Sequence, residues 1–181
     1  MKAPREFFLD RYLFAVVVGL TDGILTALTF ASGRLSSGSR GVRLDLACRL
    51  ALAASLSGLF IFFTAEYARL RGELVDAAKQ LNLASRGHLA TTRLGRAVRH
   101  DAISAAILAA ACNFFGAALP LLIGILFPSA RWLTLVISVL ALGVLGVALG
   151  HSVSGNGIRW SASLMLSGIA SALIGIELHI V

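Results

Sequence analysis

The sequence predicts an all-α membrane protein: a single domain, residues 1–181, with five transmembrane helices. Hydrophobic residues make up 57% of the chain, charged residues only 14%, and the mean hydropathy is +0.86. A soluble domain carries about 25% charged residues. Apolar runs of the roughly 20 residues needed to cross a bilayer lie at 12–33, 46–68, 102–127, 131–150 and 160–180. The joins between these runs are short, so little chain is left for a soluble domain.

The first two runs differ in how they end. Run 12–33 is interpreted as a spanning helix and not a signal peptide, because it is longer than a signal-peptide core and contains Asp22. A Ser- and Gly-rich segment follows it and predicts a loop. Run 46–68 has no stop signal, and helix-forming residues continue to Lys79. We therefore expect the second helix to project from the membrane into the cytoplasm.

Glycine and proline mark expected packing positions. Gly19 and Gly23 are four residues apart in the first run, a spacing that lets another helix approach closely. The third run contains Gly116 and then Pro120. A proline inside a spanning helix removes a backbone hydrogen bond and usually kinks the helix. These four residues are the predicted helix-packing positions.

The distribution of positive charge predicts the topology. Of the 16 Lys and Arg residues, eleven lie before the first run, between the second and third, or between the fourth and fifth. Cytoplasmic segments of membrane proteins are enriched in such residues, so we expect the N-terminus in the cytoplasm and the C-terminus outside. Residues 69–101 then form a short, basic, helical cytoplasmic join. The net charge of +7 is explained by topology and contact with the lipid bilayer, and no nucleic-acid partner is expected.

Three polar residues inside the runs predict a path for a metal ion or a proton. An unpaired charge at the membrane centre costs at least about 2.5–3.5 kcal/mol, and no run offers a basic residue at the depth of Asp22. Glu66 lies near the cytoplasmic end of the second run, and Asn113 lies at moderate depth in the third as a neutral oxygen ligand. Oxygen ligands without thiols suit a hard or borderline divalent cation, and proton carriers use the same residues.

Four residues of the basic join are candidates for cytoplasmic metal entry: Glu73, Asp76, His100 and Asp101. Their alternative interpretation is a solvated surface in which acids pair with neighbouring arginines. No nucleophile, base and orienting group occur at workable spacing, so we do not expect an enzyme. No permanently bound cofactor is expected, and the lack of a phosphate-binding glycine loop argues against ATP-driven transport by this chain.

Three segments resemble motifs of the vacuolar iron transporter family. The segment GLTDG at 19–23 resembles the Gly-x-Asn-Asp-Gly motif of that family's first helix. The segment AEY at 65–67 resembles the Gly-Glu-Tyr that ends its second helix, and FFGAALPLL at 114–122 resembles its third-helix Ser-Phe-x-x-Gly-Ala-x-x-Pro-Leu pattern. Together with five spans and a cytoplasmic N-terminus, the resemblance covers nearly the whole chain.

The resemblance implies a transporter that exports Fe²⁺, and often Mn²⁺, from the cytoplasm in exchange for protons. It implies a homodimer whose first helices line the path, with Asp22 inside it, Glu66 near its cytoplasmic mouth, and Gly19 and Gly23 bringing the two first helices close. Two features depart from the family: Phe62 stands where a methionine is common, and the basic join replaces a glutamate-rich domain.

Two alternatives therefore stay open. One is a transporter of the same fold for another cation or a small solute, and the other is a non-transporting membrane scaffold subunit. The short chain favours a prokaryotic cell membrane, or a vacuolar membrane in a eukaryote.

Overall fold

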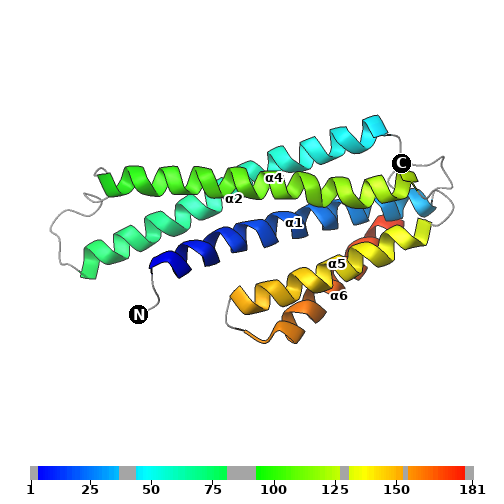
Figure 1. Cartoon of the computed structure of the whole chain (residues 1–181). Coiled ribbons are helices and arrows are strands. Elements are labelled where there is room, and N and C mark those ends of the chain that lie inside the picture. The colour runs from blue at the N-terminus through cyan, green and yellow to red at the C-terminus, as the bar shows by residue number, and fades with distance from the viewer. Residues whose placement is uncertain (1–3, 37–43, 81–92, 127–130, 153–154, 178–181) are drawn as a thin grey trace.

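The structure, a computed structural model, describes residues 4–36, 44–80, 93–126, 131–152 and 155–177. Its helices are α1 (Pro4–Ser36), α2 (Leu44–Gln80), α4 (Arg93–Leu126), α5 (Arg131–Ser152) and α6 (Gly157–Glu177). Figure 1 shows them as long rods lying side by side. The predicted all-α class is confirmed for these ranges.

Each helix contains a segment long and apolar enough to cross a membrane: Tyr12–Gly33, Leu44–Ala77, Gly95–Leu126, Trp132–His151 and Gly157–Glu177. Five candidate spans were predicted, and the second and third are longer than expected because α2 and α4 continue through the ends of the apolar runs. The last part of the basic join, from Arg93 to Asp101, is part of α4. The middle of the basic join, residues 81–92, lies outside the described residues.

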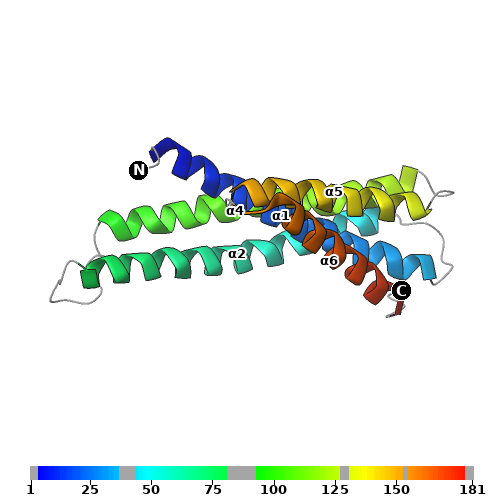
Figure 2. The same ribbon diagram turned by 90° about the horizontal axis from the view of Figure 1, so that it is seen from below.

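Helix α1 occupies the centre of the bundle. It shares its most extensive contact with α4 and also packs against α6 and α5, while it touches α2 only slightly. Helix α2 packs on α4 instead (Figure 2), and in the described part of the chain it shares no contact with α5 or α6. Helices α1 and α4 run in the same direction and α2 runs in the opposite one (Figure 1). Residues of α1, α2 and α4 line a groove.

Small residues bring α1 and α4 together. A Cβ added to Gly19 would lie 2.2 Å from the carbonyl oxygen of Ala109, and one added to Gly23 would lie 2.2 Å from that of Asn113. From the other side, a Cβ at Gly116 would lie 2.6 Å from the carbonyl oxygen of Leu20. Real Cβ atoms do not approach a backbone this closely, so these glycines set the distance between the two helices.

This contact changes the role expected for Gly19 and Gly23 in a dimer. The side of α1 that they form faces α4 of the same chain. It is therefore not available to the first helix of a second copy. A dimer contact through α1 would have to use another side of the helix, and Asp22 itself is exposed.

The outer surface of the bundle is apolar. Helices α2 and α6 are the least buried candidate spans. Leu56, Phe60 and Ile61 on α2 and Leu166 and Leu173 on α6 are all more than half exposed. Water would not solvate such a surface favourably, whereas lipid tails are as apolar as leucine. The fold is that of a multi-pass membrane protein.

The fourth expected packing position, Pro120, is buried within α4. The helix continues beyond it to Leu126. Pro120 therefore does not end the helix.

Candidate cation site

Asp22 lies in the middle of the candidate span Tyr12–Gly33 and is paired with a neutral amide. The Nδ2 of Asn113 donates a hydrogen bond of 2.7 Å to Oδ2 of Asp22. The two residues are 91 positions apart in the chain, and the close crossing of α1 and α4 brings them together. Among the described residues, no basic side chain forms an ion pair with Asp22.

Asn113 faces Asp22 with its nitrogen and not with its oxygen. The same Nδ2 donates a second hydrogen bond of 3.2 Å to the carbonyl oxygen of Ala54 on α2. Since two acceptors surround Nδ2, the reverse orientation of the amide would place oxygen against oxygen. The residue is 1% exposed, and its Oδ1 is buried without a hydrogen-bond partner. Asn113 was expected as an oxygen ligand, but here it acts toward Asp22 as a hydrogen-bond donor.

Gly58 makes room for this pair and was not anticipated from the sequence. A Cβ at Gly58 would lie 2.4 Å from Nδ2 of Asn113 and 3.7 Å from Oδ2 of Asp22. Glycine therefore lets α2 approach the amide closely, so that Ala54 can accept its second hydrogen bond. A glycine inside an apolar run is common in membrane helices, so nothing in the sequence distinguished Gly58.

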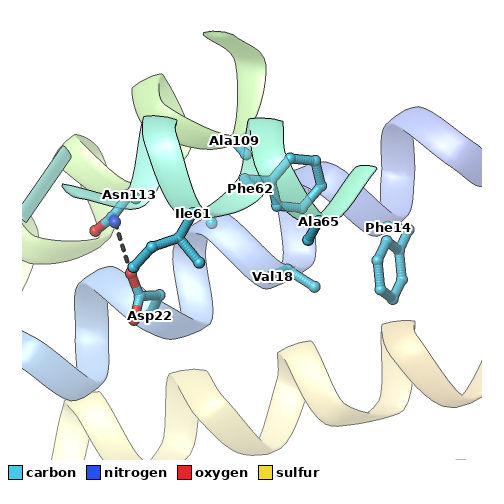
Figure 3. Close-up of a pocket in the computed structure, with 10 residues that line it drawn as sticks. Phe14, Val18, Asp22, Ile61, Phe62, Ala65, Ala109 and Asn113 are labelled. Carbon is cyan, nitrogen blue, oxygen red and sulfur yellow. Dashed lines mark hydrogen bonds between the residues drawn. The ribbon is translucent and has the colours of Figure 1, made fainter. Parts of the chain in front are cut away.

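A groove of about 340 Å³ opens beside Asp22, between α1, α2 and α4. Asp22 and Asn113 supply its polar side chains. In Figure 3 they lie at one end and Phe14 lies at the other, with Phe62 and Ala65 between them. The remaining lining residues are apolar or glycine. The groove therefore has one carboxylate, that of Asp22, at one end of a largely apolar lining.

Glu66, the second predicted path residue, does not line the groove but directly follows Ala65, which does. Its side chain is only 7% exposed. Arg69 holds it with two hydrogen bonds, from Nε to Oε2 at 2.9 Å and from Nη2 to Oε1 at 2.8 Å. Arg69 also bonds Glu73 through Nη1. Two predicted acids of α2, Glu66 and Glu73, are thus joined by one arginine.

The predicted cytoplasmic entry residues do not form a metal-binding group. No cluster of three or more His, Cys, Asp or Glu that could hold a metal ion occurs in the described parts of the chain. Asp76 pairs with Lys79 at 2.9 Å, and both are well exposed. His100 is exposed and Asp101 is half-buried, about two turns into α4. The surface ion pairs of Glu73 and Asp76 agree with the alternative interpretation of these acids as part of a solvated surface.

The fold and this site define a multi-pass helical membrane protein that carries a carboxylate within one of its candidate spans. The chain is 27% identical over 161 residues to the uncharacterized protein MJ0645 of Methanocaldococcus jannaschii, an alignment that covers 88% of this chain and 84% of that protein. No family model matches the chain. No solved structure matches it either. The function therefore has to be argued from the site.

Proposed function

We propose that the protein is a proton-coupled divalent cation exporter that moves Fe²⁺ or Mn²⁺ out of the cytoplasm, as its resemblance to the vacuolar iron transporter family implies. One observation carries the proposal. Asp22 lies within a candidate span, is exposed toward a groove, and is held by a neutral amide in place of a basic side chain. Its charge is therefore open to compensation by a mobile cation or by a proton.

The physical argument concerns what balances the charge of Asp22. A carboxylate in a membrane is costly unless a positive charge or a proton compensates it. A hydrogen bond from Nδ2 of Asn113 stabilises the carboxylate but cancels no charge. Either a proton or a cation can supply the missing charge, and the two compete for the same oxygens. Exchange of one for the other at Asp22 is the coupling step of an antiporter.

The described residues of one copy provide too few ligands for a divalent metal at this groove. Mn²⁺ and Fe²⁺ favour several oxygen or nitrogen donors, whereas the groove supplies the carboxylate of Asp22, and Asn113 faces that carboxylate with its NH₂ group. A homodimer that meets on the exposed side of α1 would bring two copies of Asp22 together. We therefore propose a dimer in which each copy contributes its Asp22 to a shared site.

In this proposal the N-terminus is cytoplasmic, as the distribution of Lys and Arg predicts. Glu66 then lies on the cytoplasmic side of Asp22, because α2 runs from Gly58 beside Asp22 towards its end at Gln80. The last turns of α2 project from the membrane. Glu66 is the last acid of α2 before the groove, because Glu73 and Asp76 lie nearer the cytoplasmic end of the helix.

A second candidate function has its own supporting observation. The groove wall is largely apolar, and no three metal-ligating side chains gather in the described segments. A transporter of the same fold for another cation or a small organic solute would use Asp22 in the same way, with apolar contacts replacing metal ligands. A scaffold subunit, by contrast, would have no need of the charge on Asp22.

The test is cation uptake into proteoliposomes with an imposed proton gradient, comparing Fe²⁺, Mn²⁺, Co²⁺ and Zn²⁺. Asp22→Asn is the test variant and Asp45→Asn is its control, because Asp45 forms only an exposed pair with Arg49. We expect uptake of Fe²⁺ or Mn²⁺ by the wild type and by Asp45→Asn, and none by Asp22→Asn. Uptake that is unaffected by Asp22→Asn would exclude the role assigned to this residue, and uptake of none of the four metals would favour the second candidate or a scaffold.

A further inference from the structure

The contact between Arg69 and Glu66 is the strongest feature that the proposed function does not explain. Both oxygens of Glu66 accept a hydrogen bond from the guanidinium, at 2.8 and 2.9 Å. Such bidentate arginine–carboxylate pairs are among the stronger and more directional polar contacts in proteins. Glu66 is 7% exposed, whereas Arg69 is 46% exposed. A carboxylate that is nearly buried is thus covered by an arginine that is open to its surroundings.

Arg69 has a second carboxylate within reach on the same helix. Glu73 lies four residues beyond Arg69, bonds its Nη1, and is 55% exposed. Residues three and four positions apart on a helix are neighbours on its surface. Arg69 can therefore leave Glu66 and remain paired with Glu73, so its displacement does not leave the guanidinium without a partner.

We propose that Arg69 is a built-in counter-cation that gates Glu66. Its guanidinium occupies the carboxylate until a divalent cation displaces it, and Glu73 retains the displaced arginine. A guanidinium and a divalent cation cannot both occupy the bidentate side of one carboxylate. Glu66 needs a positive partner in either state, because an uncompensated buried charge is costly. This inference rests on the proposed function, since it places Glu66 on the cation route.

The test is equilibrium binding of Mn²⁺ to the full chain in lipid nanodiscs, measured by the loss of the free Mn²⁺ signal in electron paramagnetic resonance. Arg69→Lys keeps the positive charge but loses the planar fork that grips both oxygens. It is preferred to Arg69→Gln, which leaves the nearly buried Glu66 without a positive partner, because removing one partner of a buried ion pair strongly destabilises the fold. Arg71→Lys is the matched control, because Arg71 is an exposed residue on the same turn of α2.

We expect Arg69→Lys to bind Mn²⁺ about tenfold more tightly than the wild type, since a weaker competitor then occupies Glu66. Arg71→Lys should bind as the wild type does. Glu73→Gln should bind about threefold more weakly, because the displaced arginine loses an exposed ion pair. Adding Glu66→Gln to Arg69→Lys should remove the gain in affinity.

Three results would contradict the gating role of Arg69. These are equal Mn²⁺ affinities of Arg69→Lys and Arg71→Lys, a gain in Mn²⁺ affinity that persists when Glu66→Gln is added to Arg69→Lys, or no Mn²⁺ binding by any variant. Transport by the wild type is measured separately in proteoliposomes. If Arg69→Lys binds Mn²⁺ more tightly through Glu66 but the wild type transports no cation, the proposed function is wrong and the gating role of Arg69 still stands. If the wild type transports cations but Arg69→Lys leaves Mn²⁺ affinity unchanged, the gating role of Arg69 is wrong and the proposed function still stands.

Discussion

A single methyl group at Gly58 should disable the site while leaving both of its polar residues in place. The added Cβ would lie 2.4 Å from Nδ2 of Asn113, a distance at which one of the two groups has to move. The added Cβ is fixed to the backbone of α2, so the end of the Asn113 side chain has to shift, and that shift disrupts its hydrogen bond to Asp22. We therefore expect Gly58→Ala to impair transport although neither Asp22 nor Asn113 is changed.

Two costs and one gain determine how strongly Gly58→Ala affects stability and the affinity of the site. Forcing an extra methyl group into a packed site costs about 1–3 kcal/mol. Losing a hydrogen bond to a charged group costs about 1.5–3 kcal/mol, which corresponds to about 10- to 100-fold in the affinity of the site. Replacing glycine by alanine in a helix contributes a stabilisation of up to about 1 kcal/mol, which offsets part of the first cost.

Gly72→Ala is the matched control for this prediction. Gly72 lies on the same helix, and nothing lies within 4 Å of its added Cβ. Because the gain in helix propensity is common to both variants, the difference between them isolates the contact at Gly58. We expect Gly58→Ala to unfold at a lower temperature than Gly72→Ala in detergent, and to lose transport while Gly72→Ala keeps it. Identical unfolding temperatures and identical transport would refute the close approach of α2 to the amide.

Three further outcomes are expected. Asn113→Leu removes the donor to Asp22, so the carboxylate loses a hydrogen bond that holds it in place and the Mn²⁺ concentration that gives half-maximal transport should rise about tenfold or more; an unchanged concentration would contradict the positioning role. Gly23→Val places its Cβ against the backbone of α4, which cannot move aside as a side chain does. The free energy of unfolding should fall by about 1–3 kcal/mol or more, and less folded protein should be recovered in detergent. Normal recovery and a normal unfolding temperature would contradict the close crossing of α1 and α4. Asp76→Asn breaks only an exposed pair with Lys79 and should change stability by less than about 1 kcal/mol, with Mn²⁺ transport unchanged; a loss of transport would restore Asp76 as an entry residue.

The elements of the fold follow from local properties of the chain. Bilayer-length apolar runs predicted the five helices, and the depth of Asp22 in its run marked it as a site residue. Residues 19 and 23 were expected to allow a close helix approach. The sequence did not reveal that the approaching helix is α4 of the same chain, because a four-residue glycine spacing is compatible with any apolar partner.

The chemistry of the site depends on register between helices and was only partly predictable. The pairing of Asp22 with Asn113 joins residues 91 positions apart, and the contact of Asn113 with Ala54 spans 59 positions. No local pattern encodes such distances. The donor orientation of Asn113 depends on the carbonyl group of Ala54, and any residue type carries that group. The space left by Gly58 has no signature of its own for the same reason.

The central claim is that a proton and a metal ion exchange at Asp22. Its most direct test loads proteoliposomes with a Mn²⁺ indicator and a pH indicator together and applies a Mn²⁺ gradient with no initial pH difference. The account predicts that Mn²⁺ entry drives protons outward in the same vesicles, and that Asp22→Asn abolishes both signals. Mn²⁺ entry without proton movement, or proton movement that persists in Asp22→Asn, would contradict it.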